Sequence, residues 1–188
     1  MKKIIVLISA IMISAPCVLA KAGTIASYTI DAEKNAYIHN NKGIEYASEK
    51  LYYAAIQEFK IAISLNPKKQ STAVYFNNLG KVYMEIGYPE LAVDCFENSV
   101  IQYSLNFEYY KNLADCYKAL GVSQEKLELY RSKSDENPMF KIMVGLLEEQ
   151  RGNLKKAIIT FDEFAMSEPD LIITPAVKAY TKELSGKI

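Results

Sequence analysis

The sequence has no tryptophan, one histidine and three cysteines among its 188 residues. Because His39 is the only histidine, neither a Ser/His nor a Cys/His catalytic pair is indicated, and a histidine packed between helices is the simpler interpretation. The cysteines form no CxxC motif and no HxxxH spacing is present, so nothing indicates a metal centre. No glycine-rich phosphate loop follows a predicted strand. We therefore predict that the chain is not an enzyme and that it needs no cofactor or metal.

The chain also lacks an excess of either charge, since it has 22 basic and 22 acidic residues. Binding to nucleic acid or to an anionic membrane surface requires clustered positive charge. The charge balance therefore predicts neither partner. Half of the residues are apolar, which is enough to build the continuous core of one domain.

The first twenty residues have the pattern of an export signal. Lys2 and Lys3 precede an uncharged apolar run over residues 4–15, which Pro16 interrupts, and small residues follow. We predict a signal peptide over residues 1–20, with cleavage near Ala20 or near Ala22. The mature chain would then be periplasmic or extracellular, without stable insertion in a membrane.

Two alternatives compete with a cleaved signal. An uncleaved membrane anchor is less favoured because the apolar run is shorter than the roughly 20 residues that span a bilayer. A lipid anchor on Cys17 is less favoured because the residues before this cysteine lack the leucine and the small residue of a lipobox.

Small and large residues recur along the rest of the chain at a nearly constant period. The first copy of the pattern comprises Gly43, Tyr46, Ala55, Phe59, Ala62 and Pro67. Later copies carry their small residue at Gly80, Ala114 and Gly145. Small residues let two helix backbones approach closely, and proline ends a helix, so each copy predicts a pair of antiparallel helices.

This spacing resembles the tetratricopeptide repeat, a helix-turn-helix unit of 34 residues. The resemblance implies an all-α fold, a right-handed α-solenoid of about four repeats within residues 32–169. The repeats are expected at about 36–69, 73–106, 107–137 and 138–169. A flexible lead-in at 21–31 precedes them, and a C-terminal capping helix at 170–188, with a polar outer face, follows them.

Two departures from the pattern concern the geometry within pairs. The first pair has Glu49-Lys50 at the turn where the others have glycine, which leaves its turn geometry open. In the third repeat Lys126 and Lys133 replace two alanines, so its second helix is expected to pack less closely on its neighbours.

The resemblance also implies a concave groove lined by the first helix of each pair, which would hold a peptide or a protein segment. Carried over to this chain, the groove residues are Tyr37, Asn40, Ile44, Asn77, Lys81, Met84, Glu108, Lys111, Asp115, Lys118, Met139, Ile142 and Leu146. Unpaired amide and charged groups in the middle would hydrogen-bond the ligand. Met139, Ile142 and Leu146 would either accept apolar side chains or form core under the terminal helix.

The predicted function is that of an exported, non-catalytic scaffold that binds a protein or peptide partner. The resemblance suggests envelope assembly, pilus biogenesis or secretion as its setting. A carboxylate clamp is not expected, because Glu108 would repel a ligand carboxylate. The alternatives are a structural module that self-associates into a homo-oligomer and an accessory subunit of an envelope enzyme.

Cys95 and Cys116 lie in consecutive repeats, on helices expected to be neighbours. An oxidising compartment would permit a disulfide between them. Two separate small core residues are the alternative, because a disulfide requires a closer approach than the sequence can establish.

Overall fold

The structure is a computed structural model that describes residues 22–65 and 68–188, with side chains described from residue 32 onward. The predicted signal peptide over residues 1–20 and the helix-ending Pro67 therefore lie outside the described residues. Within them the chain forms helices joined by short turns and no strand. The helices are α1 (Ala22–Ser48), α2 (Tyr52–Ser64), α3 (Lys69–Glu85), α4 (Pro89–Gln102), α5 (Phe107–Ala119), α6 (Ser123–Ser132), α7 (Phe140–Gln150), α8 (Leu154–Ser167) and α9 (Thr174–Ser185).

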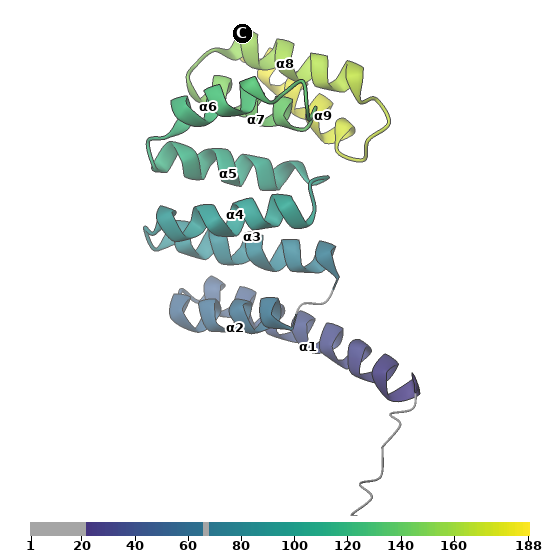
Figure 1. Cartoon of the computed structure of the whole chain (residues 1–188). Coiled ribbons are helices and arrows are strands. Elements are labelled where there is room, and N and C mark those ends of the chain that lie inside the picture. The colour runs from purple at the N-terminus through teal and green to yellow at the C-terminus, as the bar shows by residue number, and fades with distance from the viewer. Residues whose placement is uncertain (1–21, 66–67) are drawn as a thin grey trace, which may run out of the picture.

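These helices stack in chain order from α1 and α2 at one end to α8 and α9 at the other (Figure 1). Successive helices pack on each other, and the inner helices α1, α3, α5 and α7 also follow one another along one side. One large core runs through the stack from Ala55 in α2 to Leu184 in α9, and a second, small cluster of Ala36, Ala62 and Tyr75 lies at the N-terminal end. The predicted all-α solenoid of helical repeats is confirmed.

The N-terminal helix is longer than expected. We predicted a flexible lead-in at 21–31, but α1 begins at Ala22 and not at Ala32 or Glu33. The segment contains no proline and only one glycine, Gly23, so no residue in it stops a helix that continues into the first repeat. The lead-in is therefore helical from Ala22.

Three repeats share one crossing between their two helices. A Cβ atom added to Gly43 would lie 2.7 Å from Cε1 of Phe59, one on Gly80 would lie 2.7 Å from Cε1 of Phe96, and one on Gly145 would lie 2.4 Å from Cε1 of Phe161. Each phenylalanine follows its glycine by sixteen residues. The glycines thus leave room for an aromatic ring of the second helix to lie directly on the backbone of the first.

The turns between the two helices of each pair are equally regular, including the turn at Glu49-Lys50, whose geometry the sequence left open. Lys50 has a φ of 62°, beside 80° for Gly87, 72° for Gly121 and 80° for Gly152. After each of these residues the next backbone N–H donates to a carbonyl five residues earlier, as Leu51 does to Tyr46 at 2.8 Å. This is the Schellman ending of a helix, and the first repeat forms it with lysine in place of glycine.

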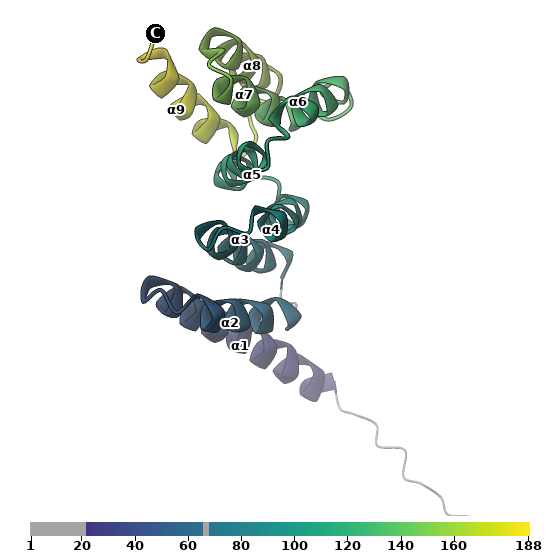
Figure 2. The same cartoon turned by 90° about the vertical axis from the view of Figure 1, so that its left-hand side faces the viewer.

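The third repeat departs from the other three. Ala114 stands where they have glycine, and its Cβ would collide with an aromatic ring placed as in those repeats. Tyr130, sixteen residues later, instead packs against Phe140 of α7 with ring centroids 5.2 Å apart. Accordingly α6 packs mainly on α7 and only slightly on α5, while α5 contacts α7 directly. Figure 2 shows α6 lying to one side of the stack.

The displaced helix is tied to both neighbours by polar contacts. The hydroxyl of Tyr117 in α5 donates to Glu97 Oε1 at 2.7 Å and lies 3.0 Å from the hydroxyl of Tyr130. The ammonium group of Lys126 lies 4.8 Å from the centre of the Tyr117 ring and 3.8 Å from Glu97 Oε1. The looser packing expected of this helix is observed, in the one repeat that has alanine, Ala114, where the others have glycine.

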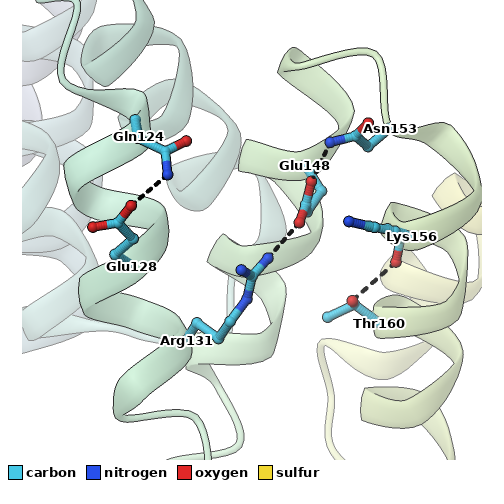
Figure 3. A network of polar contacts seen from close by, with 7 residues as sticks. All are labelled: Gln124, Glu128, Arg131, Glu148, Asn153, Lys156 and Thr160. Carbon is cyan, nitrogen blue, oxygen red and sulfur yellow. Dashed lines mark hydrogen bonds and ion pairs between the residues drawn. The ribbon is translucent and has the colours of Figure 1, made fainter.

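On its other side α6 is held by a buried carboxylate. Glu148 of α7 is 2% exposed and accepts hydrogen bonds from the Arg131 guanidinium of α6 and, at 2.6 Å, from Nδ2 of Asn153 (Figure 3). A buried charge is tolerated only when it is paired and hydrogen-bonded. Arg131 therefore fixes the position of α6 on the last repeat.

We expect Gly80→Ala to destabilise the protein by about 1–3 kcal/mol, since the new methyl group would force the Phe96 ring out of its place. Urea denaturation measures the change. The double variant Gly80→Ala with Phe96→Leu should lose much less than the sum of the two single variants. Additive losses would contradict the proposed contact.

Lys50→Gly should stabilise the protein by about 0.5–1 kcal/mol, because glycine avoids the 1–2 kcal/mol cost of a left-handed side-chain residue but loses more entropy on folding. Lys42→Gly is the matched control, since Lys42 is exposed inside α1, where glycine destabilises. Thermal unfolding of both variants should show shifts of opposite sign, and equal shifts would contradict the turn assignment.

Arg131→Ala should destabilise the protein by about 2–3 kcal/mol, because it leaves the Glu148 carboxylate buried with a neutral donor only. The loss is smaller than for a fully buried pair since the Arg131 side chain is 54% exposed. Adding Glu148→Gln to Arg131→Ala should recover part of the stability. A double variant less stable than Arg131→Ala alone would rule out this role.

Candidate protein-binding groove

Three hollows follow one another along the inner helices of the array. The first, of about 170 Å³, lies between α1 and α3 and is lined by Ile44, Ala47, Phe59, Asn78, Lys81, Val82 and Glu85. The second, of about 340 Å³, lies between α3 and α5 and is lined by Lys81, Met84, Glu85, Phe96, Asn112 and Asp115. The third, of about 300 Å³, lies between α5 and α7 and is lined by Lys111, Ala114, Asp115, Lys118, Leu146, Glu149, Gln150 and Tyr180. Because neighbouring hollows share residues, they form one continuous groove.

The glycine crossings create the floor of this groove. Phe59 and Phe96, the rings that lie on Gly43 and Gly80, form part of the first and second hollows. The exposed walls of these two hollows are mainly apolar, and side chains such as Ile44 and Met84 supply that surface because both rings are 1% exposed. The packing that builds the repeats therefore supports the hollows from below, while the accessible side chains above the rings would contact a ligand.

The third hollow differs because its lining is mainly charged. Its rim carries Lys111 and Lys118 of α5, Asp115 of α5 and Glu149 of α7. Gln150 Nε2 donates to Asp115 Oδ1 at 3.1 Å, and the Tyr180 hydroxyl donates to Glu149 Oε2 at 2.7 Å. Burial, together with the bond to Glu149, raises the pKa of the Tyr180 phenol, so Tyr180 remains a donor at neutral pH.

A set of side-chain amide bonds connects the inner helices. Asn78 Nδ2 donates to Asn40 Oδ1 at 2.9 Å, and Asn112 Nδ2 donates to Asn77 Oδ1 at 2.7 Å. Asn40 is 5% exposed and Asn77 is 4% exposed. Our prediction that these two amides are unpaired groups facing a ligand is therefore wrong, because both are buried and accept hydrogen bonds from the neighbouring repeat.

The last repeat also differs from the groove prediction. Ile142 is fully buried and Leu146 is 3% exposed, while Met139 is partly buried against the core. Tyr180 of α9 covers this region, with its ring 5.1 Å from Phe107 and 5.9 Å from Phe161. Ile142 and Leu146 thus belong to the core, and of the three residues only Leu146 lines the third hollow.

The remaining predicted groove residues lie on the inner helices with part of their side chain accessible. Tyr37 is 61% exposed and Ile44 is 48% exposed on α1. Lys81, Glu108, Asp115 and Lys118 are exposed, whereas Met84 and Lys111 are partly buried. Lys81 Nζ lies 3.3 Å from Glu108 Oε1, which links α3 to α5 across the groove surface. Asn78 and Asn112 line the hollows but were not among the groove residues predicted from the sequence. They directly follow the predicted residues Asn77 and Lys111.

His39 and the two cysteines belong to the packing and not to the groove. His39 Nδ1 lies 2.6 Å from Glu58 Oε2, between α1 and α2. Cys95 and Cys116 are buried, free thiols, and the Cys116 thiol donates to the Pro89 carbonyl at 3.2 Å. Burial raises the pKa of Cys95 to about 12 and that of Cys116 to about 11. Both thiols are therefore protonated and poor nucleophiles at neutral pH.

Two further features of the described residues bear on other functions. No group of three His, Cys, Asp or Glu side chains among them is arranged to hold a metal ion. None of the described helices combines the length and the apolar character that a membrane span needs.

Comparisons with known proteins agree with the fold. A family model described as tetratricopeptide repeat matches residues 73–100, which cover most of α3 and α4. The photosystem I assembly protein Ycf3 of Prochlorococcus marinus (strain MIT 9301) is 23% identical over 96 residues, 51% of this chain and 56% of that protein. The chain thus matches little more than half the length of this curated relative.

One solved structure has a similar fold, and a second resembles the chain more weakly. A tetratricopeptide repeat protein from Parabacteroides merdae has a TM-score of 0.51 and 20% identity, with 82% of this chain and 61% of that chain covered. MamA has a TM-score of 0.49 and 20% identity, with 81% and 84% covered. The chain is therefore similar to tetratricopeptide repeat proteins in one matched repeat, residues 73–100, and in its helical-repeat fold. It is a helical-repeat scaffold of the kind that mediates protein interactions, and such scaffolds are generally non-catalytic.

The state of the cysteines can be tested with a thiol reagent at pH 8. Because both thiols are buried and protonated, we expect Cys95 and Cys116 to react slowly in the native protein and fast in urea. A Cys95→Ser variant should lose one of the reactive groups seen in urea. If neither cysteine reacts in urea before a reductant is added, the two are joined in a disulfide and the free-thiol assignment is wrong.

Proposed function

We propose that the chain is an exported scaffold without catalytic activity that holds a segment of a partner protein in the groove defined by the three hollows. The single observation that carries the proposal is the continuity of these hollows along α1, α3, α5 and α7. Ligand sites in proteins are concave, with apolar walls and a few polar groups that set orientation, and the groove has both.

The exposed apolar side chains on the inner side add support. Tyr37 and Ile44 lie seven residues apart on α1, hence on one face of that helix, and each exposes about half of its side chain or more. Large apolar groups gathered beside a groove indicate a contact surface. Because of the hollows this contact surface is concave, and a protein segment can fill it.

The setting that we propose is the cell envelope, in assembly, pilus biogenesis or secretion. The signal-like pattern of residues 1–20 favours export. The name of the matched relative from Prochlorococcus marinus describes that protein as an assembly protein, and an assembly role is compatible with a groove that holds a partner segment. Capture of the partner from cells would identify the pathway.

A crosslinking capture from the cell of origin tests groove binding. The groove variant Ile44→Asp with Lys111→Glu should lose most captured partners, because both changes alter the walls of the hollows. The matched control is Ile61→Asp with Lys60→Glu on α2, where both residues are exposed away from the hollows. Circular dichroism confirms that both variants fold. Identical partner sets for the groove variant and the wild type would contradict the proposal.

A further inference from the structure

The hollows repeat at the spacing of the inner helices, and this spacing restricts the backbone shape of a ligand that fills all three. Neighbouring packed helices lie about 8–10 Å apart. Side chains seven residues apart in an α-helix lie on the same face and about 10.5 Å apart along the axis. A helix lying along the groove can therefore place one side chain in each hollow.

Other backbone shapes fit the groove less well. In an extended strand, side chains on one face recur about every 6.6–6.8 Å, which does not match one side chain per hollow. A polyproline II segment repeats every three residues at about 9.3 Å, but it docks on grooves lined by exposed aromatic rings. The Phe59 and Phe96 rings are each 1% exposed, and the exposed aromatic side chain on this side of α1 is Tyr37. Among the residues that the structure describes, the first two hollows therefore lack the exposed aromatic rings on which a polyproline II segment docks.

The composition of the hollows sets the side chains of the ligand. The first and second hollows have mainly apolar exposed walls, built on Phe59 and Phe96. Each suits an aliphatic side chain, which would leave the amide and charged groups at the rim in water. The first two anchors of the ligand should therefore be apolar.

The third hollow has two lysines without a close acidic partner in the described part of the chain, beside two carboxylates that are already hydrogen-bonded. Lys111 and Lys118 form no ion pair within 4 Å among the described residues, and the Lys111 ammonium group lies 5.2 Å from the centre of the Tyr180 ring. The acidic residues of this hollow, Asp115 and Glu149, already accept hydrogen bonds from Gln150 and Tyr180. A carboxylate brought between the two lysines would give them charged partners.

We propose that the occupant of the groove is an amphipathic α-helix of a partner protein with two apolar anchors seven residues apart and a carboxylate seven residues beyond the second. This inference rests on the proposed function and specifies its ligand. The apolar anchors enter the hollows at Ile44 and Met84, and the carboxylate pairs with Lys111 and Lys118.

A random library of 18-residue peptides displayed on phage, selected on the purified protein and counter-selected on the Ile44→Asp, Lys111→Glu variant, tests the ligand class. We expect the enriched peptides to carry apolar residues seven apart and an acidic residue seven further on. Groove-dependent peptides with alternating apolar residues or with proline repeats would overturn the assignment of a helical ligand. Groove-dependent peptides with a basic third anchor would overturn the assignment of a carboxylate. In either case the proposal of groove binding would stand. Peptides that bind the groove variant as well as the wild type would overturn both the proposed groove binding and the proposed ligand class.

A charge exchange tests the third anchor with a selected peptide. Fluorescence anisotropy should show that the selected peptide binds the Lys118→Glu variant at least tenfold more weakly than the wild type. A peptide in which lysine replaces the acidic anchor should bind this variant with restored affinity. Lys155→Glu, on the exposed start of α8, is the matched control and should bind like the wild type. Equal binding by Lys118→Glu and the wild type, or no recovery on exchange, would overturn the pairing.

Discussion

The contact between a glycine of the first helix and a phenylalanine ring of the second is the constraint on which the rest of this structure depends. At Gly43, Gly80 and Gly145 the ring lies where a side chain would begin, so the two helices approach more closely than other residues allow. Two of the same rings, Phe59 and Phe96, form the floor of the groove. Fold and proposed binding surface thus share one set of residues.

The third repeat, which lacks this contact, has a different helix arrangement. This repeat has Ala114 in place of glycine, Tyr130 packs against Tyr117 and Phe140, and α6 packs mainly on α7. The buried Glu148 then needs Arg131 as its partner across the new interface. α5 contacts α7 directly, Ile142 of α7 is fully buried, and the last hollow, between α5 and α7, has charged residues at its rim.

Much of the fold could be predicted because it depends on residue type at a fixed interval. The crossings at Gly43 and Gly80 and the all-α solenoid follow from such intervals. The groove was predicted less well, since the side of an inner helix that a residue occupies changes by about 100° per position. Asn40 and Asn77 were therefore assigned to the groove, although they pair between repeats. The looser packing of α6 could be predicted from Lys126 and Lys133, but its contact with α7 through Arg131 and Glu148 could not, because that pair lies outside the repeat pattern.

Proton NMR of the glycine Hα resonances tests the central contact most directly. The nearest Phe96 ring atoms lie at 2.7, 2.9 and 2.9 Å from the Cβ position of Gly80, nearly equal distances that place this position over the face of the ring. Gly43, Gly80 and Gly145 should then each show one Hα resonance shifted upfield by the ring current, unlike Gly87, Gly121 and Gly152, which have no side chain near. Ordinary shifts at all six glycines would contradict the account.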